Sequence, residues 1–355
     1  MTSAKHAHVV GLGLIGASLA LALRDAHWVV TGDDLDPEVV ELALASGVIA
    51  STTPDPHVGL ILVATPAGVV AEVARDYLAR FDDPSVIVTD VAGVKGAIVD
   101  EVTSTRFLGG HPMAGSELRG LRGARADLFQ SCTWVLTPTA TTPADLYTRL
   151  HGHLRDIGAN VVAVSSADHD RLVALASHVP HLVAGALMNQ AADAAREDAV
   201  LLQLAAGGFR DMTRIAAGDP AIWPDVLFEN SDAVTSGLRA LEERLGSLRS
   251  AVANRDRAAL EASLTSASTA RRQLPGRALK SEDMAYLRVL ISDRPGSLAQ
   301  VTMTASEMLV NIYDIEIAHA IEGDRGTLLL AVDAQQADRF MAALRDADFG
   351  VVRET

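Results

Sequence analysis

A histidine held between two glycines and a proline is well suited to acid–base chemistry. His111 follows Gly109 and Gly110 and precedes Pro112, at the end of a strand-like segment over 105–111. A neutral imidazole can accept the proton of a substrate hydroxyl while hydride leaves the same carbon, and its ordinary pKa of about 6.5 suits this work. From this string alone, a simple turn residue is an equal alternative.

Three glycines near the N-terminus predict a nucleotide-binding turn. Gly11, Gly13 and Gly16 have the spacing GxGxxG after a strand-like run, and they open a helix-like stretch that includes Leu14 and Ile15. The first glycine permits a tight turn, the second lets the backbone approach a pyrophosphate, and the third lets the helix pack on the strand. The free N–H groups at the helix start would bind the phosphates.

An acidic residue and a second turn complete the predicted cofactor site. Asp34 ends the next strand-like segment, roughly twenty positions after the glycines, where an acidic side chain binds the ribose 2′-OH. Because a carboxylate there also repels a 2′-phosphate, we expect NAD rather than NADP. Thr65 and Pro66 end a third segment, at the sheet edge where ligands bind, although an ordinary turn would look the same.

Two arginines four residues apart are candidates for binding an anionic substrate. Arg210 and Arg214 would share one face of a helix, and a guanidinium can bind a carboxylate through two parallel hydrogen bonds. The formal net charge is −15, so an anionic substrate would need such cations. We expect Arg214 to bind the carboxylate and Arg210 to contribute secondarily; solvated helix arginines are the alternative.

Seven short apolar segments are expected to form the sheet that positions these residues. They alternate with amphipathic helical stretches, which indicates a parallel sheet covered on both faces. The sequence therefore predicts an α/β Rossmann-type domain over residues 1–165. The segments are 8–13, 27–34, 58–66, 85–90, 105–111, 132–138 and 160–165.

The rest of the chain has a different pattern. Residues 166–273 are rich in Ala and Leu with helical periodicity, which predicts an all-α domain. A linker by composition follows at 274–284. Residues 284–355 have the order βαββαβ, which predicts a ferredoxin-like unit.

Composition narrows the class of protein. The 355 residues exceed what one hydrophobic core usually holds, and Cys132 is the only cysteine. No uncharged apolar stretch of about twenty residues appears, the N-terminus leaves no room for a signal peptide, and no dense Lys/Arg run occurs. We expect a soluble cytoplasmic protein that binds neither membrane nor nucleic acid.

The spacing of three further histidines predicts neither a metal site nor a catalytic pair. His178 and His181 lie three apart, but no third ligand at a recognisable interval completes a metal site, so no metal is expected. His169 and the adjacent Asp170 have the pattern of a helix start, and we expect no chemical role for them.

These motifs resemble the TyrA family of prephenate and arogenate dehydrogenases. The resemblance extends over essentially the whole chain. It implies a homodimer that performs NAD-dependent oxidative decarboxylation of prephenate to 4-hydroxyphenylpyruvate in tyrosine biosynthesis, with arogenate as the alternative substrate. The strings that carry it are GLGLIGASLALAL, TDVAGVKG, HPMAGSE, SHVPH and GGFRDMTRIAAGDPAIWPDV.

The same resemblance implies roles for individual residues. In the family the histidine of HPMAG, here His111, is the catalytic hydrogen-bond partner of the ring hydroxyl. Glu117 is associated with gating the site, His181 lines the substrate pocket, and Arg214 binds the ring carboxylate.

One position departs from the family pattern. The family commonly reads Asp-x-x-Ser-Val-Lys, with the serine hydroxyl bonded to the substrate and to the catalytic histidine, whereas this chain has Gly93 at that position. A water molecule, Ser116 or another donor would then have to replace the hydroxyl.

The C-terminal unit resembles an ACT domain through DRPGSLAQV and NIYDIEIA. Such domains bind amino acids at paired interfaces, so Asp293, Gly296 and Asn311 are candidate contacts for an effector, with tyrosine expected. A domain that only dimerises is the alternative.

Two other functions stay open. A β-hydroxyacid dehydrogenase shares the glycine fingerprint and a helical second domain, but it would be expected to carry a catalytic lysine. A non-catalytic amino-acid sensor is supported only by Gly93.

Overall fold

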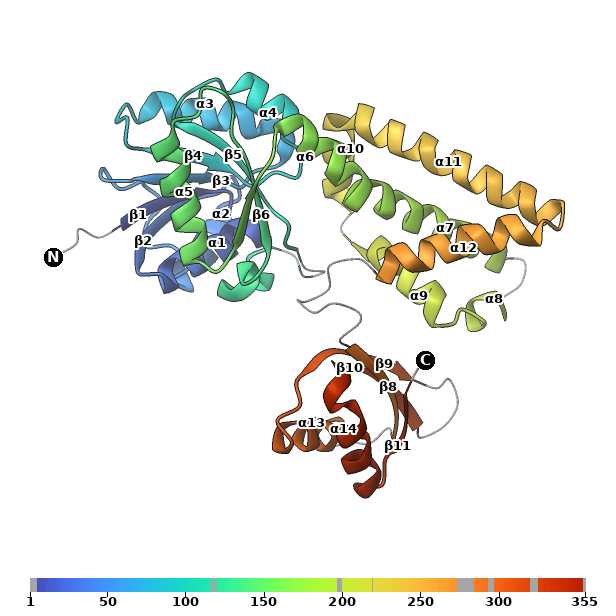
Figure 1. The fold of residues 1–355 in the computed structure, drawn as a ribbon. Helices are drawn as coiled ribbons and strands as arrows, with labels where there is room; N and C mark the ends of the chain where they lie inside the picture. The colour runs from blue at the N-terminus through green and yellow to red at the C-terminus, as the bar shows by residue number, and fades with distance from the viewer. Residues whose placement is uncertain are drawn as a thin grey trace. The chain divides into compact units, whose positions relative to one another are not determined.

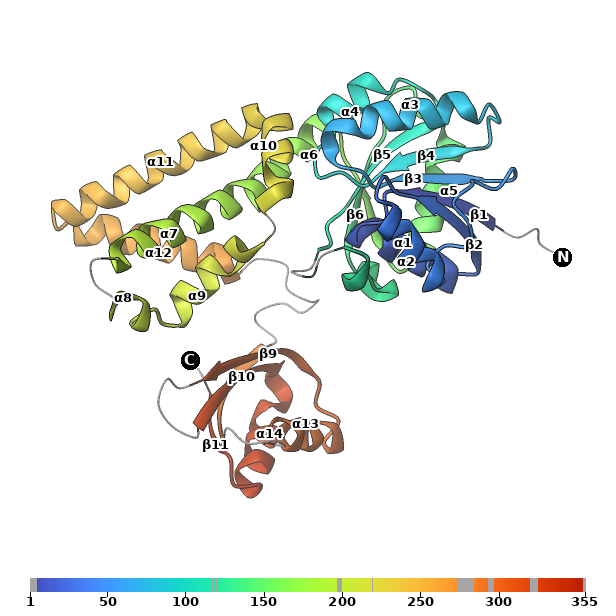
Figure 2. The same ribbon diagram turned by 180° about the vertical axis from the view of Figure 1, so that it is seen from behind.

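The computed structural model describes residues 5–115, 118, 120–196, 200–218, 220–272, 284–292, 297–319 and 325–353. The chain divides into two compact units, residues 1–243 and 244–355, and each is described by itself. The first unit holds the larger sheet and the helices up to residue 243 (Figures 1 and 2).

A seven-stranded sheet forms the first part of this unit, and all seven predicted strands are present. The strand order is β2-β1-β3-β4-β5-β6-β7, so the chain adds β2 on one side of β1 and then β3 on the other side. Ligands of such sheets bind where the order changes sides in this way, beyond the carboxyl ends of the strands. The strands are β1 (Lys5–Val10), β2 (Trp28–Asp33), β3 (Leu60–Val63), β4 (Ile87–Asp90), β5 (Phe107–Pro112), β6 (Thr133–Thr137) and β7 (Asn160–Ala163).

One pairing differs from the expected parallel sheet. Strand β6 runs antiparallel to β5, with Gly110 opposite Leu136. The connection between them contains two short 3-10 helices, Leu121–Gly123 and Ala126–Phe129, in place of an α-helix. A parallel neighbour needs a crossover that is usually helical, so without one the chain returns beside β5 in the opposite direction.

Helices cover both faces of this sheet. On one face α1 and α5 bury Leu19 and Leu150 in the core that contains Trp134. On the other face α3 and α4 bury Leu78 and Ile98. The helices are α1 (Leu14–Asp25), α2 (Pro37–Ala45), α3 (Val70–Arg80, preceded by the 3-10 helix Ala67–Val69), α4 (Gly96–Glu101) and α5 (Ala144–Asp156).

The helical region begins with one long helix that contains a π-turn. Helix α6 (Ser166–Val173), the π-turn (Ala174–His178) and α7 (Val179–Ala195) follow without a break. Pro180 lies in the first turn of α7, and because proline has no N–H to donate to the preceding turn, the wider turn accommodates it. Turns of this kind are frequent at functional sites, and this one contains His178.

Two of the short α-helices that follow, and one 3-10 helix, pack on α7. Helix α11 approaches it closely at Gly237, where a Cβ atom would lie 2.9 Å from Val179 Cγ2. The elements are α8 (Val200–Gln203), α9 (Gly207–Thr213), the 3-10 helices Arg214–Ala217 and Pro220–Ile222, α10 (Trp223–Glu229), α11 (Ser231–Ala253) and α12 (Arg257–Arg272).

The long helix Ser166–Ala195 is apolar enough to cross a membrane by length and composition, and 28% of its most apolar window is buried. One such helix is weak support for a membrane span, because core helices of globular proteins have the same composition. Its exposed apolar residues instead indicate a packing surface.

The second unit contains a four-stranded antiparallel sheet in the order β11-β8-β10-β9. The predicted βαββαβ succession is present, and α13 and α14 bury Val301 and Phe340 against this sheet. The elements are β8 (Met284–Ser292), α13 (Ser297–Glu307), β9 (Ile312–His319), β10 (Arg325–Asp333), α14 (Ala334–Asp346) and β11 (Gly350–Arg353).

Candidate active site

The glycine turn after β1 has the geometry of a dinucleotide site. Gly11 has φ +91°, and a Cβ atom there would lie 2.7 Å from the carbonyl oxygen of Ala64. A Cβ atom at Gly16 would meet the Gly11 carbonyl, so a side chain there would separate α1 from the turn. At Gly13 a Cβ atom would meet nothing within 4 Å. The backbone at Gly13, just before Leu14 and Ile15 in α1, is therefore open to a pyrophosphate.

The two aspartates at the end of β2 have different partners. Oδ2 of Asp34 accepts a 2.7 Å hydrogen bond from the N–H of Leu12, inside the glycine turn. Asp33 instead accepts a 2.7 Å bond from the hydroxyl of Tyr77 on α3. The carboxylate beside the glycine turn is therefore that of Asp34.

The turn after β3 lies against the same glycines. Its first residue, Ala64, contacts Gly11 and Gly16. The next side chain, Thr65, has a buried hydroxyl with no hydrogen-bond partner in the described part of the chain, and Pro66 begins the turn into α3. A buried hydroxyl without a partner is costly, so this hydroxyl is available to a ligand that binds beside the glycine turn.

His111 lies at the end of β5 and is hydrogen-bonded to a second histidine. Its Nδ1 is 2.8 Å from Nε2 of His169, and Nδ1 of His169 is 2.7 Å from Oδ1 of Asp170. Burial lowers the pKa of His111 well below its usual range, and the positive charge of Lys95 acts in the same direction. A lowered pKa favours the neutral imidazole, the form that can accept a proton.

We expected no chemical role for His169 and Asp170, but the structure places both behind the ring of His111. Both are at the start of α6, but their side chains point back to the sheet domain. Asp170 accepts hydrogen bonds from the backbone N–H groups of Lys95, at 2.8 Å, and Gly96, at 2.7 Å. Sequence reasoning missed them because a His-Asp pair at a helix start has a common local explanation.

Gly93 lies on the other side of the His111 ring. A Cβ atom at Gly93 would be 3.7 Å from Nε2 of His111 and 3.9 Å from Cγ1 of Val226 on α10. These are ordinary contact distances, so the position has room for a side chain. The Nε2 atom thus faces the space that the family serine would occupy.

A buried ion pair holds the loop that carries Gly93. Lys95 and Asp90 are both fully buried, and the Lys95 ammonium donates to Oδ2 of Asp90. Asp90 also accepts from the N–H of Ala92, at 2.9 Å, and from the N–H of Gly110, at 3.1 Å. The loop is therefore tied to β5 one residue before His111.

The three residues predicted to contact the substrate, His181, Arg210 and Arg214, lie in the helical region. The ring of His181 stacks on Trp223 with 3.6 Å between centroids, and burial lowers its pKa. Arg214 begins the 3-10 helix that packs on α7, while Nε of Arg210 donates to the carbonyl of Ala205 at 3.3 Å. Both arginines are exposed.

Five further residues were predicted to contribute to a site. Ser116, Glu117, Asp293 and Gly296 fall outside the described residues. Asn311 is described; it is exposed and immediately precedes β9.

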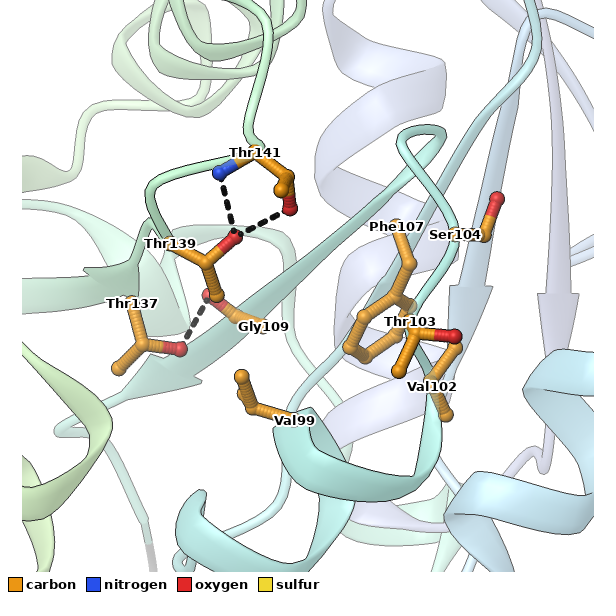
Figure 3. A pocket seen from close by; sticks show the side chains of 9 residues that line it. All are labelled: Val99, Val102, Thr103, Ser104, Phe107, Gly109, Thr137, Thr139 and Thr141. Atoms are coloured by element: carbon orange, nitrogen blue, oxygen red, sulfur yellow. Dashed lines mark hydrogen bonds between the residues drawn. The ribbon is translucent and has the colours of Figure 1, made fainter.

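A cavity of about 220 Å³ opens beside β5, but it has no acid–base group. Figure 3 shows the threonine hydroxyls that line it, including Thr137, which donates to the carbonyl of Gly109. With no titratable residue in its lining, this cavity is separate from the chemistry of His111. Its lining residues are Val99, Val102, Thr103, Ser104, Phe107, Gly109, Thr137, Thr139 and Thr141.

Two family models match the first unit and the beginning of the second. Residues 19–163 match the prephenate dehydrogenase nucleotide-binding domain, and residues 165–266 match the prephenate dehydrogenase dimerization domain. A prephenate dehydrogenase of Bacillus subtilis is 31% identical over 91% of each chain.

Solved structures agree with these matches. A prephenate dehydrogenase from A. aeolicus, in complex with hydroxyphenyl propionate and NAD+, has a TM-score of 0.71 and 29% identity, covering 77% of this chain and 99% of that one. An arogenate dehydrogenase from Synechocystis has a TM-score of 0.65 and 31% identity, covering 75% and 98%.

Proposed function

This chain belongs to the prephenate dehydrogenase family, and we propose that His111 is the base of its NAD-dependent oxidation of prephenate. The chain is an NAD-dependent oxidoreductase by its nucleotide-binding domain and its relatives. The observation that carries the proposal is the placement of His111, with Nδ1 bonded to His169 and Nε2 facing the space beside Gly93.

The cofactor site fits NAD at three independent points. The open backbone at Gly13 suits the pyrophosphate, the carboxylate of Asp34 suits the ribose, and the hydroxyl of Thr65 lacks a partner that a ligand would provide. NAD+ supplies a hydride acceptor. We assign Gly11, Gly13, Leu14, Ile15, Gly16, Asp34, Thr65 and Pro66 to its binding.

The proton chemistry belongs to His111. Its Nε2 accepts the proton of the ring hydroxyl as hydride leaves the carbon that bears it, and loss of the ring carboxylate as CO2 then leaves an aromatic phenolate. The imidazolium returns the proton to that oxygen, so the product is a phenol and His111 is again neutral. A positioned base of this kind contributes about 10²–10⁴-fold to the rate.

Substrate anchoring is assigned to the helical region. Prephenate carries two carboxylates, and we propose that Arg214 binds the ring carboxylate, with Arg210 as a weaker contributor. We assign His181 to the wall of the pocket, where Trp223 holds its ring. Ser116 and Glu117 follow His111 in the chain, and we keep them as a substrate contact and a gating residue.

The direct test is NADH formation from purified protein with prephenate or arogenate. We expect turnover with prephenate, and a loss of at least about a hundredfold in kcat for His111→Asn. His57→Asn, a change at an exposed histidine, is the matched control and should leave kcat unchanged. Near-normal turnover of His111→Asn would remove His111 from the mechanism.

Arogenate is the alternative substrate, supported by the structural similarity to an arogenate dehydrogenase. The two substrates differ only in a keto or an amino group on the side chain. Side-by-side values of kcat/KM decide between them, and a higher value with arogenate would reassign the substrate.

We also propose that the chain is a homodimer. Residues 165–266 match a dimerization domain, and the long helix of that region exposes Leu172 and Leu175. Sedimentation equilibrium should give twice the mass of one chain; a monomer at micromolar concentration would contradict the proposal.

For the second unit we propose an ACT-type regulatory role with tyrosine as effector. Its βαββαβ order supports the fold. Asn311 is exposed immediately before β9, and Asp293 and Gly296 are further candidate contacts. Calorimetric titration with tyrosine should detect binding that is lost in Asn311→Ala. Absence of binding by any aromatic amino acid would leave dimerisation as the role of this unit.

A further inference from the structure

Three side chains lie in a row behind the proposed base. His111 Nδ1 is 2.8 Å from His169 Nε2, and His169 Nδ1 is 2.7 Å from Asp170 Oδ1. His169 is 1% exposed, so water does not compete for its ring nitrogens. The three come from two elements, β5 and α6, and α6 packs on α4 and β6 (Figure 1).

The direction of each hydrogen bond in this row follows from the carboxylate. Asp170 is ionised: burial opposes its ionisation, but hydrogen bonds from His169 and two backbone N–H groups hold its pKa below the usual value. An ionised carboxylate only accepts hydrogen bonds. The proton between His169 and Asp170 must therefore be on Nδ1 of His169.

A neutral His169 with its proton on Nδ1 has only a lone pair on Nε2. The bond to His111 then requires that Nδ1 of His111 carries the proton. The remaining nitrogen of His111, Nε2, is left with its lone pair on the Gly93 side. Only this tautomer can accept a proton from a hydroxyl placed there.

We propose that His169 and Asp170 are positioning residues that set His111 in its base tautomer through a His111–His169–Asp170 relay. The inference rests on the proposed function of His111 as the base. In the same way that a buried aspartate orients the histidine of a serine protease, the carboxylate here orients a histidine, but through one additional imidazole.

The relay is also tied to the loop that faces the substrate. Both oxygens of Asp170 accept backbone N–H groups of the loop, from Lys95 and Gly96, and the side-chain amide of Asn230 donates to the Asp170 carbonyl at 2.8 Å. One carboxylate thus fixes the tautomer of His111 and the place of Gly93 relative to it. This arrangement keeps the base oriented in a chain that lacks the family serine.

Substitutions at His169 separate the relay from simple packing. In His169→Gln the amide oxygen can take the place of Nε2 and still accept from His111. In His169→Asn the shorter amide can still donate to Asp170 but leaves His111 without its acceptor. We expect kcat to fall by at least about a hundredfold in His169→Asn and by no more than about tenfold in His169→Gln.

Asp170→Asn directly tests the direction of the hydrogen bonds between Asp170, His169 and His111. The amide can donate to Nδ1 of His169, which puts a proton on Nε2 of that ring and forces His111 into the opposite tautomer. We expect a loss of at least about a hundredfold in kcat, with NAD affinity unchanged, as in proteases with the equivalent change.

The deciding readout is the ¹⁵N NMR spectrum of histidine-labelled full-length protein. Wild type should show His111 protonated at Nδ1, and Asp170→Asn should show it protonated at Nε2. A proton on Nε2 of His111 in the wild type, or three variants within about threefold of wild-type kcat, would overturn the relay. If wild type oxidises neither prephenate nor arogenate, the proposed function fails, while the NMR result still decides the tautomer.

Discussion

Nε2 of His111 lies 3.7 Å from the point where a Cβ atom at Gly93 would be. Apart from Gly93 and its two chain neighbours, no atom of the described residues comes closer to that point, and Gly93 is not among the glycines with positive φ. Gly93→Ser should therefore fold normally and place a hydroxyl within reach of the His111 ring. One added hydrogen bond is worth about 1 kcal/mol, so we expect kcat/KM for prephenate to rise by about fivefold.

Gly93→Ala is the matched variant, because it adds the same carbon without the hydroxyl. It should resemble wild type. If kcat/KM for the serine variant is no higher than for the alanine variant, the hydroxyl does not contribute to catalysis in this chain.

The pH dependence of kcat/KM should differ from that of an ordinary histidine base. His111 must be neutral to accept a proton, and burial lowers its pKa. As the pH falls, the neutral form therefore persists through the usual histidine range near about 6.5, and kcat/KM should decline only below it. A pH–rate profile with prephenate measures this; an acidic limb with a midpoint at or above the usual value would contradict it.

Asp34→Ser should weaken the preference for NAD. The change removes the carboxylate beside the glycine turn, so kcat/KM with NAD should fall about tenfold while that with NADP rises. Asp33→Ser is the control, because Asp33 is bonded to Tyr77 instead. Equal loss of preference in both variants would mean that the two carboxylates act together.

Arg214→Gln should raise the KM for prephenate by at least about tenfold, since loss of a charge-assisted bond costs a few kcal/mol. Arg210→Gln, four residues earlier, should have a smaller effect. NAD binding should be unchanged in both. An unaltered KM in the Arg214 variant would place that arginine on a solvated face.

Lys95→Met should destabilise the sheet domain strongly. It leaves the fully buried Asp90 without its ionic partner, and an unpaired buried charge costs about 3–5 kcal/mol. Thermal unfolding should show a clearly lower Tm, and adding Asp90→Asn should recover part of the loss. A double variant less stable than the single one would argue against the unpaired charge as the cause.

Many structural elements of this protein can be predicted from short segments of its sequence. The glycine turn, the seven strands and the βαββαβ succession each depend on neighbours within a few residues, so composition and spacing predict them. The sequence singles out His111 as a candidate for the same reason, because its glycines and proline are adjacent to it. The antiparallel direction of β6 was not predicted, because the alternation of strands and connections does not reveal in which direction the chain returns.

Only the tertiary structure decided what surrounds His111. His111 and His169 are 58 residues apart in sequence, and they meet because α6 packs on α4 and β6. The same packing gives Asp170 its backbone donors on the Gly93 loop. Likewise, Asp33 and Asp34 are identical in type and adjacent in sequence, but the strand end turns one toward Tyr77 and the other toward the glycines. The sequence determines the type of each side chain. The partner of each side chain depends on which distant surfaces the folded chain brings into contact.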